Sequence, residues 1–177
     1  MSAFVVTRQQ RRSVIGLATA VLLAVVVVMN VTDRSTASQS EQALPDIAFE
    51  RFDGDMASLA EFEGRPLVIN FWASWCPACV AELPEFEAAH LEYADEVTFV
   101  GIANADIRQA ADRLAESVGL TYTLGDDPDG DMFRELGLFA MPSTIFVTAD
   151  GEIHEVFGGQ LDERALTERI DDLIGAS

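Results

Sequence analysis

The only two cysteines of the chain, Cys76 and Cys79, are separated by two residues and follow an apolar, branched run at 66–71. Such a run is typical of a buried parallel strand. Apolar residues after Cys79 recur at helical spacing, so we expect Cys76 where a strand ends and a helix begins. Unpaired backbone N–H groups and the helix dipole favour a thiolate at such a position. The pattern therefore predicts a reversible dithiol/disulfide couple.

Two other uses of the cysteine pair fit the sequence less well. A structural zinc site needs four ligands, and the other candidates, His90 and His154, are far apart and unpaired in the sequence. A purely structural disulfide would close too short a loop to remove much entropy from the unfolded chain. We therefore expect no metal and no other cofactor.

The N-terminal part of the chain has the pattern of a membrane anchor. Residues 1–12 are basic, with Arg8, Arg11 and Arg12, and residues 13–32 carry no charge and consist mainly of Val, Leu and Ala. Twenty residues of helix cover about 30 Å, the thickness of a bilayer core. Because basic flanks stay in the cytoplasm, the sequence predicts a cytoplasmic N-terminus, a single-pass transmembrane signal anchor in the cell membrane and an extracytoplasmic domain.

The fate of this segment has alternatives. The small residues at 35–37 are compatible with a cleavage site, although we favour an uncleaved anchor. The pair Arg11-Arg12 is compatible with a twin-arginine export signal, but the residues around it match poorly. Residues 33–43 are rich in Ser, Thr, Gln and Ala, so we expect a flexible linker there and a folded domain at 44–177.

The charge of the chain limits its partners. Beyond residue 40 lie 7 of the 11 basic residues and 29 of the 30 acidic residues, which gives that part a formal charge of −22. Such a surface excludes nucleic acid as a partner and favours a well-solvated domain. An extracytoplasmic location suits a redox-active cysteine pair, because disulfides persist there.

Turn signals and apolar patterns divide the domain into alternating strands and helices. Asp53-Gly54 and Asp150-Gly151 predict two hairpins, and Pro84 predicts a kink in a helix. Asp106 is expected to cap a helix that Gly119 closes. The alternation predicts an α/β fold with a mixed central sheet flanked by helices. We expect strands at 47–49, 56–59, 66–72, 97–103, 121–124, 143–147 and 153–157, and helices at 76–93, 106–118, 131–136 and 162–174.

Residues 44–174 resemble the thioredoxin superfamily, and within it the membrane-anchored TlpA/ResA-like thiol–disulfide oxidoreductases. The resemblance implies a thioredoxin-like fold for the domain at 44–177. It rests on Gly64-Arg65-Pro66, on the run from Val68 to Cys76, on Cys79 with Glu82 and Pro84, and on Met141-Pro142-Ser143-Thr144.

The resemblance also implies roles for individual residues. Cys76 would be the attacking cysteine and Cys79 the resolving cysteine. Pro142 would be a cis-proline that faces the disulfide, although cis X-Pro bonds are uncommon. The backbone of Met141 would then pair with an extended substrate, so the implied substrate-binding residues are Trp75, Met141 and Pro142.

The chain departs from its relatives at several supporting positions. Asn70 stands where thioredoxin has a buried aspartate, so no carboxylate base is present there. Pro77 fits the first helical turn but removes an N–H that could bond the Cys76 sulfur. No cation lies within the motif, which predicts a less stabilised thiolate and hence a mild reductant. The acidic residues Glu82, Glu85 and Glu87 are candidate proton relays, but acidic residues early in a helix more often lie on the surface.

The sequence thus predicts a reductase that exchanges disulfides with a disulfide-containing protein. The resemblance implies apocytochrome c as a substrate and a membrane electron donor for the dithiol. An oxidase of secreted proteins and a non-catalytic, membrane-tethered binding or chaperone module remain alternatives. Peroxidase chemistry expects Thr or Ser where Ala73 lies, and copper-chaperone relatives place three residues between their cysteines.

Overall fold

The computed structural model describes residues 42–177. The predicted segments at 1–12 and 13–32, and all of the linker except its last two residues, lie outside this part. Among the described residues, no helix has the length and apolar character needed to cross a membrane. The elements in chain order are β1 (Gln42–Ala43), β2 (Ala48–Arg51), β3 (Met56–Ser58), the 3-10 helix η1 (Leu59–Phe62), β4 (Leu67–Trp72), α2 (Pro77–Tyr93), β5 (Thr98–Asn104), α3 (Arg108–Val118), β6 (Thr123–Asp127), α4 (Asp131–Glu135), β7 (Ser143–Val147), β8 (Glu152–Gly158) and α5 (Glu163–Ala176).

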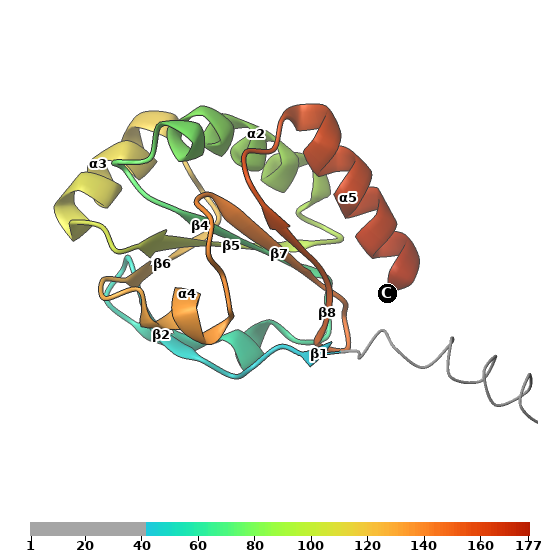
Figure 1. Ribbon diagram of the computed structural model, residues 1–177. Helices are drawn as coiled ribbons and strands as arrows, with labels where there is room; N and C mark the ends of the chain where they lie inside the picture. Colours follow the sequence, from blue (N-terminus) through green and yellow to red (C-terminus); the bar gives the residue numbers. More distant parts are fainter. Residues whose placement is uncertain (1–41) are drawn as a thin grey trace, which may run out of the picture. The chain divides into compact units, whose positions relative to one another are not determined.

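The strands form one mixed sheet in the order β1-β8-β7-β4-β5-β6-β2-β3. The central strands β4, β5 and β6 run parallel, whereas β7 pairs antiparallel with β4 and β8. Figure 1 shows α2, α3 and α5 on one face of the sheet and α4 on the other. The predicted α/β fold with a mixed sheet flanked by helices is therefore confirmed.

Strand β4 places the site because it is buried along its whole length at the centre of the sheet. Its side chains alternate between the two faces, as in any strand. Ile69 and Phe71 belong to the apolar cluster that also contains Met132 of α4, whereas Val68 belongs to the cluster that contains Phe86 of α2. Fully burying a side chain such as Phe71 contributes about 1.5–3 kcal/mol. This packing anchors the strand that leads into the cysteines.

Both predicted hairpins are present, but several boundaries differ from expectation. Gln42–Ala43, assigned to the flexible linker, pairs as β1 with β8 and belongs to the sheet. The strand expected at 121–124 runs at Thr123–Asp127, because its backbone pairs with β5 as far as Asn104. These differences come from pairing with distant strands, which local patterns do not report.

The predicted cap of the helix expected at 106–118 is wrong. Helix α3 begins at Arg108 with Ile107 as its N-cap and no side-chain capping bond. The side chain of Asp106 instead accepts hydrogen bonds from Ser74, in the segment that precedes the cysteines. Gly119 does close the helix, in the left-handed conformation at φ 84°.

Candidate active site

The two cysteines form a disulfide at the start of α2. Cys76 is the N-cap residue of the helix, and Pro77 occupies its first turn. The Cys79 backbone N–H donates to the Cys76 sulfur over 3.2 Å. Cys76 is 5% exposed and Cys79 is fully buried. The strand-to-helix position expected from the sequence is therefore confirmed, and only Cys76 reaches the surface.

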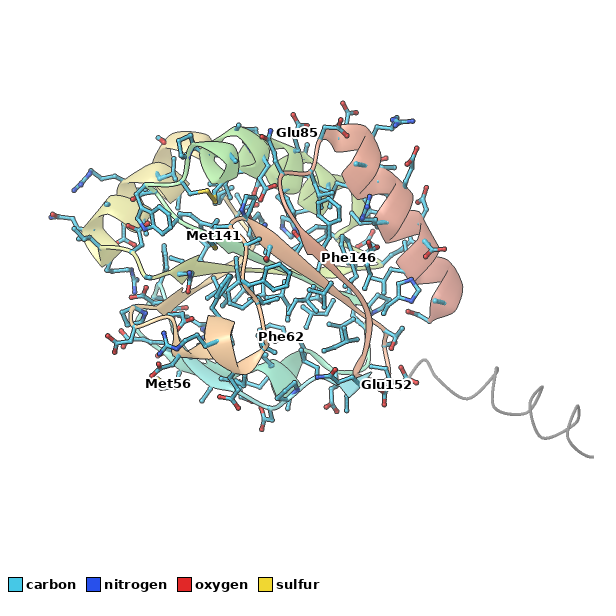
Figure 2. The ribbon with its side chains drawn as sticks, in the orientation of Figure 1. Met56, Phe62, Glu85, Met141, Phe146 and Glu152 are labelled. Atoms are coloured by element: carbon cyan, nitrogen blue, oxygen red, sulfur yellow. A yellow bond between two sulfur atoms is a disulfide. The ribbon has the colours of Figure 1, made fainter. Side chains whose placement is uncertain are left out.

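The predicted cis-proline is confirmed, because the Met141-Pro142 peptide bond is cis. Met141 lies on the loop that leads into β7 (Figure 2) and packs against the apolar cluster that contains Cys76 and Cys79. Its sulfur accepts a hydrogen bond from the Asn104 side chain over 3.7 Å. Within residues 42–177, neither the N–H nor the C=O of Met141 pairs with another backbone group. The loop therefore has free backbone groups beside the disulfide cluster.

Trp75, the residue before Cys76, lies on the surface. Its side chain is 57% exposed, and its indole N–H donates to the backbone carbonyl of Ala105 over 3.0 Å. Ile107, two residues after Ala105 in the chain, is 74% exposed. An apolar surface thus borders the cysteines on the side of the loop after β5.

Glu82 contradicts the expectation of a surface carboxylate, because its side chain is fully buried. One carboxylate oxygen accepts from the Asn70 amide at 2.9 Å, and the other accepts from the Leu161 backbone N–H at 2.9 Å. Burial raises the pKa of Glu82 from its usual value of 4.5 to about 7, although both hydrogen bonds oppose this rise. A group with this pKa can gain or lose a proton near neutral pH.

Glu82 and the cysteines share one helix, which explains their proximity. Glu82 follows Cys79 by three residues, and side chains at that spacing are neighbours on a helix. The other two candidate relays differ: Glu85 and Glu87 are only partly buried. Glu87 accepts hydrogen bonds from the N–H and the hydroxyl of Thr121. Of the three, only Glu82 is fully buried.

Asn70 connects the sheet to this carboxylate. It is 1% exposed, and its amide nitrogen donates both to Glu82 and, at 3.4 Å, to the Thr144 hydroxyl. Its carbonyl oxygen has no hydrogen-bond partner among the described residues. The alternation of side chains along β4 could have indicated that Asn70 faces α2. The contact with Glu82 required the packing of the helix on the sheet.

The two histidines contact residues other than the cysteines. His90 packs edge-on against Phe99 and Tyr122, and His154 pairs with Asp172 at 2.8 Å. In the part of the chain from 42 to 177, no group of three or more His, Cys, Asp or Glu side chains is arranged to hold a metal ion.

A helix that begins at a Cys-x-x-Cys disulfide, set beside a cis-proline loop on a mixed sheet, defines the chain as a thiol–disulfide oxidoreductase of the thioredoxin superfamily. The Redoxin family model matches residues 39–173, so the chain belongs to that family.

Similar proteins agree with this class. The thiol-disulfide oxidoreductase ResA of Halalkalibacterium halodurans is 30% identical over 137 residues, which are 77% of this chain and 77% of that protein. The structure of a putative thiol:disulfide interchange protein DsbE from Chlorobium tepidum is 25% identical with a TM-score of 0.71, and the match covers 76% of this chain and 97% of that one. A secreted thiol-disulfide isomerase from Corynebacterium glutamicum is 25% identical with a TM-score of 0.68, and the match covers 75% and 85% of the two chains.

Proposed function

We propose that this protein is a membrane-anchored, extracytoplasmic reductase of protein disulfides. The observation that carries the direction of electron flow is the environment of the Cys76 sulfur. In the structure this sulfur accepts one backbone N–H, from Cys79, and the intervening Pro77 has none to donate. A weakly stabilised thiolate means a weakly stabilised reduced form, so the dithiol gives up its electrons readily.

The first step is attack by the reduced protein on its substrate. The Cys76 thiolate attacks one sulfur of the substrate disulfide, forms a mixed disulfide and expels the other substrate sulfur as a thiolate. The free N–H and C=O of Met141 pair with the extended substrate backbone, next to Pro142 and the exposed ring of Trp75. These contacts hold the substrate disulfide against the one cysteine that reaches the surface.

The second step needs a base for the buried cysteine. Glu82 takes the proton from the Cys79 thiol, because its pKa of about 7 lies near that of a thiol and the two side chains are neighbours on α2. The Cys79 thiolate then attacks Cys76, and the substrate leaves as its second thiolate. Two electrons pass to the substrate, and the Cys76–Cys79 disulfide remains on the protein.

Asn70 can serve both protonation states of Glu82. Its amide nitrogen donates to the ionised carboxylate, as in the structure. After a half-turn of the amide, the free carbonyl oxygen of Asn70 would accept the proton of the neutral carboxylic acid. Asn70 thus supports proton transfer although it cannot itself carry a proton.

The location and partners follow from the N-terminal pattern and from the relatives. The uncharged run at 13–32 after basic residues at 1–12 supports a single-pass anchor, with 33–43 as its linker. The relative from Corynebacterium glutamicum is described as secreted. By the resemblance to TlpA/ResA-like proteins, we propose apocytochrome c as a substrate and a membrane protein as the donor that reduces the dithiol again.

The reduction potential separates this function from an oxidase. Equilibration of the full-length protein with glutathione buffers should give a potential well below about −120 mV, the value of a strong thiol oxidant. Ala78→His should raise this potential, because an imidazolium beside the sulfur stabilises the thiolate. Ala81→His, at an exposed position of the same helix, is the matched control and should leave it nearly unchanged. A wild-type potential near −120 mV, or no response to Ala78→His, would favour the oxidase.

A further inference from the structure

The loop that follows β5 is bonded to the segment that precedes Cys76. One oxygen of Asp106 accepts from the Ser74 backbone N–H at 2.5 Å, and the other accepts from the Ser74 hydroxyl at 2.8 Å. That second oxygen also accepts from the Ile107 backbone N–H at 2.7 Å. The next residue, Trp75, donates its indole N–H to Ala105. Both residues before the nucleophile are therefore held by one loop.

The backbone of this loop is itself under strain. Ala105 has φ 47°, and it is the one residue other than glycine with a positive φ among the described residues. A non-glycine residue in this conformation costs about 1–2 kcal/mol. Its N–H donates to the Asp127 carbonyl at 2.8 Å, which holds the loop against the end of β6. Backbone strain of this kind persists where surrounding contacts impose it, and it clusters at functional sites.

Only a carboxylate satisfies all of the donors that face Asp106. Two of these are backbone N–H groups, which cannot reverse their role, and each faces a different carboxylate oxygen. An asparagine would present an NH2 group to one of them in either orientation of its amide. The side chain at position 106 thus matches Ser74 and Ile107 because both of its oxygens accept hydrogen bonds.

From these contacts we propose that Asp106 is a positioning residue for the dithiol: it holds the Ser74–Trp75 segment, and its charge keeps the couple reducing. Two residues of chain span at most about 7 Å, so the carboxylate lies within about 10 Å of the Cys76 backbone. A negative charge there opposes the Cys76 thiolate. This inference deepens the proposed reductase function, because it names a group that sets the direction of electron flow.

The size of the effect follows from electrostatics. At an effective dielectric constant of about 20, two unit charges about 10 Å apart change an equilibrium constant by somewhat more than tenfold. Salt screens part of this interaction. The full effect appears only where Cys76 of the reduced protein is ionised, so the equilibrium is measured at a pH above the pKa of this thiol. There we expect Asp106→Asn to favour the reduced dithiol by about tenfold, which is a rise of about 30 mV for a two-electron couple.

The test measures the equilibrium of the full-length protein with glutathione for four proteins: wild type, Asp106→Asn, Ser74→Ala and Glu116→Gln. Glu116 lies exposed on α3 and is the matched loss of one negative charge. Glu116→Gln should change the equilibrium constant with glutathione by less than about twofold. Ser74→Ala keeps the charge of Asp106 and the backbone hydrogen bond, so it should change this constant by less than about threefold. A change below twofold in Asp106→Asn, or an equal change in Glu116→Gln, would overturn the proposal.

A second measurement does not depend on the folding of any variant. In the wild-type protein, the Ser74 amide should exchange its hydrogen at least about tenfold more slowly than an unprotected amide, because it is bonded to Asp106. Exchange at the unprotected rate would also overturn the proposal. The reductase hypothesis fails separately: a wild-type potential near that of strong oxidants would reject it, whereas the ratio between variant and wild type would still test Asp106.

Discussion

Replacing Glu82 with glutamine should change how the stability of the protein depends on pH. The pKa of Glu82 is raised from 4.5 to about 7 in the folded protein, so the folded state keeps a proton that the unfolded state releases. In the wild type, this group therefore makes the free energy of unfolding fall as pH rises from about 4.5 to about 7. Glutamine does not titrate, so the variant lacks this contribution.

The magnitude follows from the two pKa values. A difference of one pKa unit corresponds to about 1.36 kcal/mol. For pKa values of 4.5 in the unfolded state and about 7 in the folded state, Glu82 lowers the free energy of unfolding relative to its value at low pH. This loss is about 0.8 kcal/mol at pH 5 and about 3.3 kcal/mol at pH 8. The variant should therefore gain about 2.5 kcal/mol relative to the wild type between these pH values. Working above pH 5 keeps the protein away from its isoelectric point near 4.1.

The assay is urea unfolding of the oxidised full-length protein at several pH values between 5 and 8. All other carboxylates titrate in both proteins, so the difference between the two curves isolates Glu82. Glu85→Gln is the matched control, because Glu85 lies on the same helix at a partly exposed position at the edge of the molecule (Figure 2). A difference between Glu82→Gln and wild type that stays constant within about 0.5 kcal/mol, the usual additivity error, would refute the argument.

Further predictions concern the chemistry and the topology of the protein. Cys79→Ser should accumulate mixed disulfides with substrate, because Cys76 can attack but no second cysteine releases the substrate. Cys76→Ser should trap no substrate. Gel electrophoresis under non-reducing conditions measures both results. Equal trapping by the two variants would argue against Cys76 as the nucleophile, and turnover by Cys76→Ser equal to wild type would favour the binding-module alternative. Protease added to the outside of cells, once any outer barrier is opened, should cut the domain or the linker at 33–43. Full protection beside an exterior control that is cut would show that the orientation is wrong.

Much of the fold could be predicted from local patterns. The apolar run of β4 marked a buried strand, and the Asp-Gly pairs marked both hairpins, because these features depend only on neighbouring residues. The cysteine spacing placed the redox pair at the start of α2 for the same reason. The cis bond before Pro142 was implied by the resemblance to a family, since a proline in a turn does not by itself reveal its isomer.

The remaining parts of the site were decided by contacts between distant segments. The sequence predicts that Glu82 is a surface residue of an acidic helix. In the structure it is buried, because α2 packs it against Asn70 of β4 and the Leu161 backbone. The sequence predicts that Asp106 caps a helix. In the structure its carboxylate accepts a hydrogen bond from Ser74, which lies 32 residues earlier in the chain. A local sequence pattern indicates which side chains share one face of a strand or helix. Which polar groups meet across those faces, and hence which pKa values move, is determined only when the helices pack on the sheet.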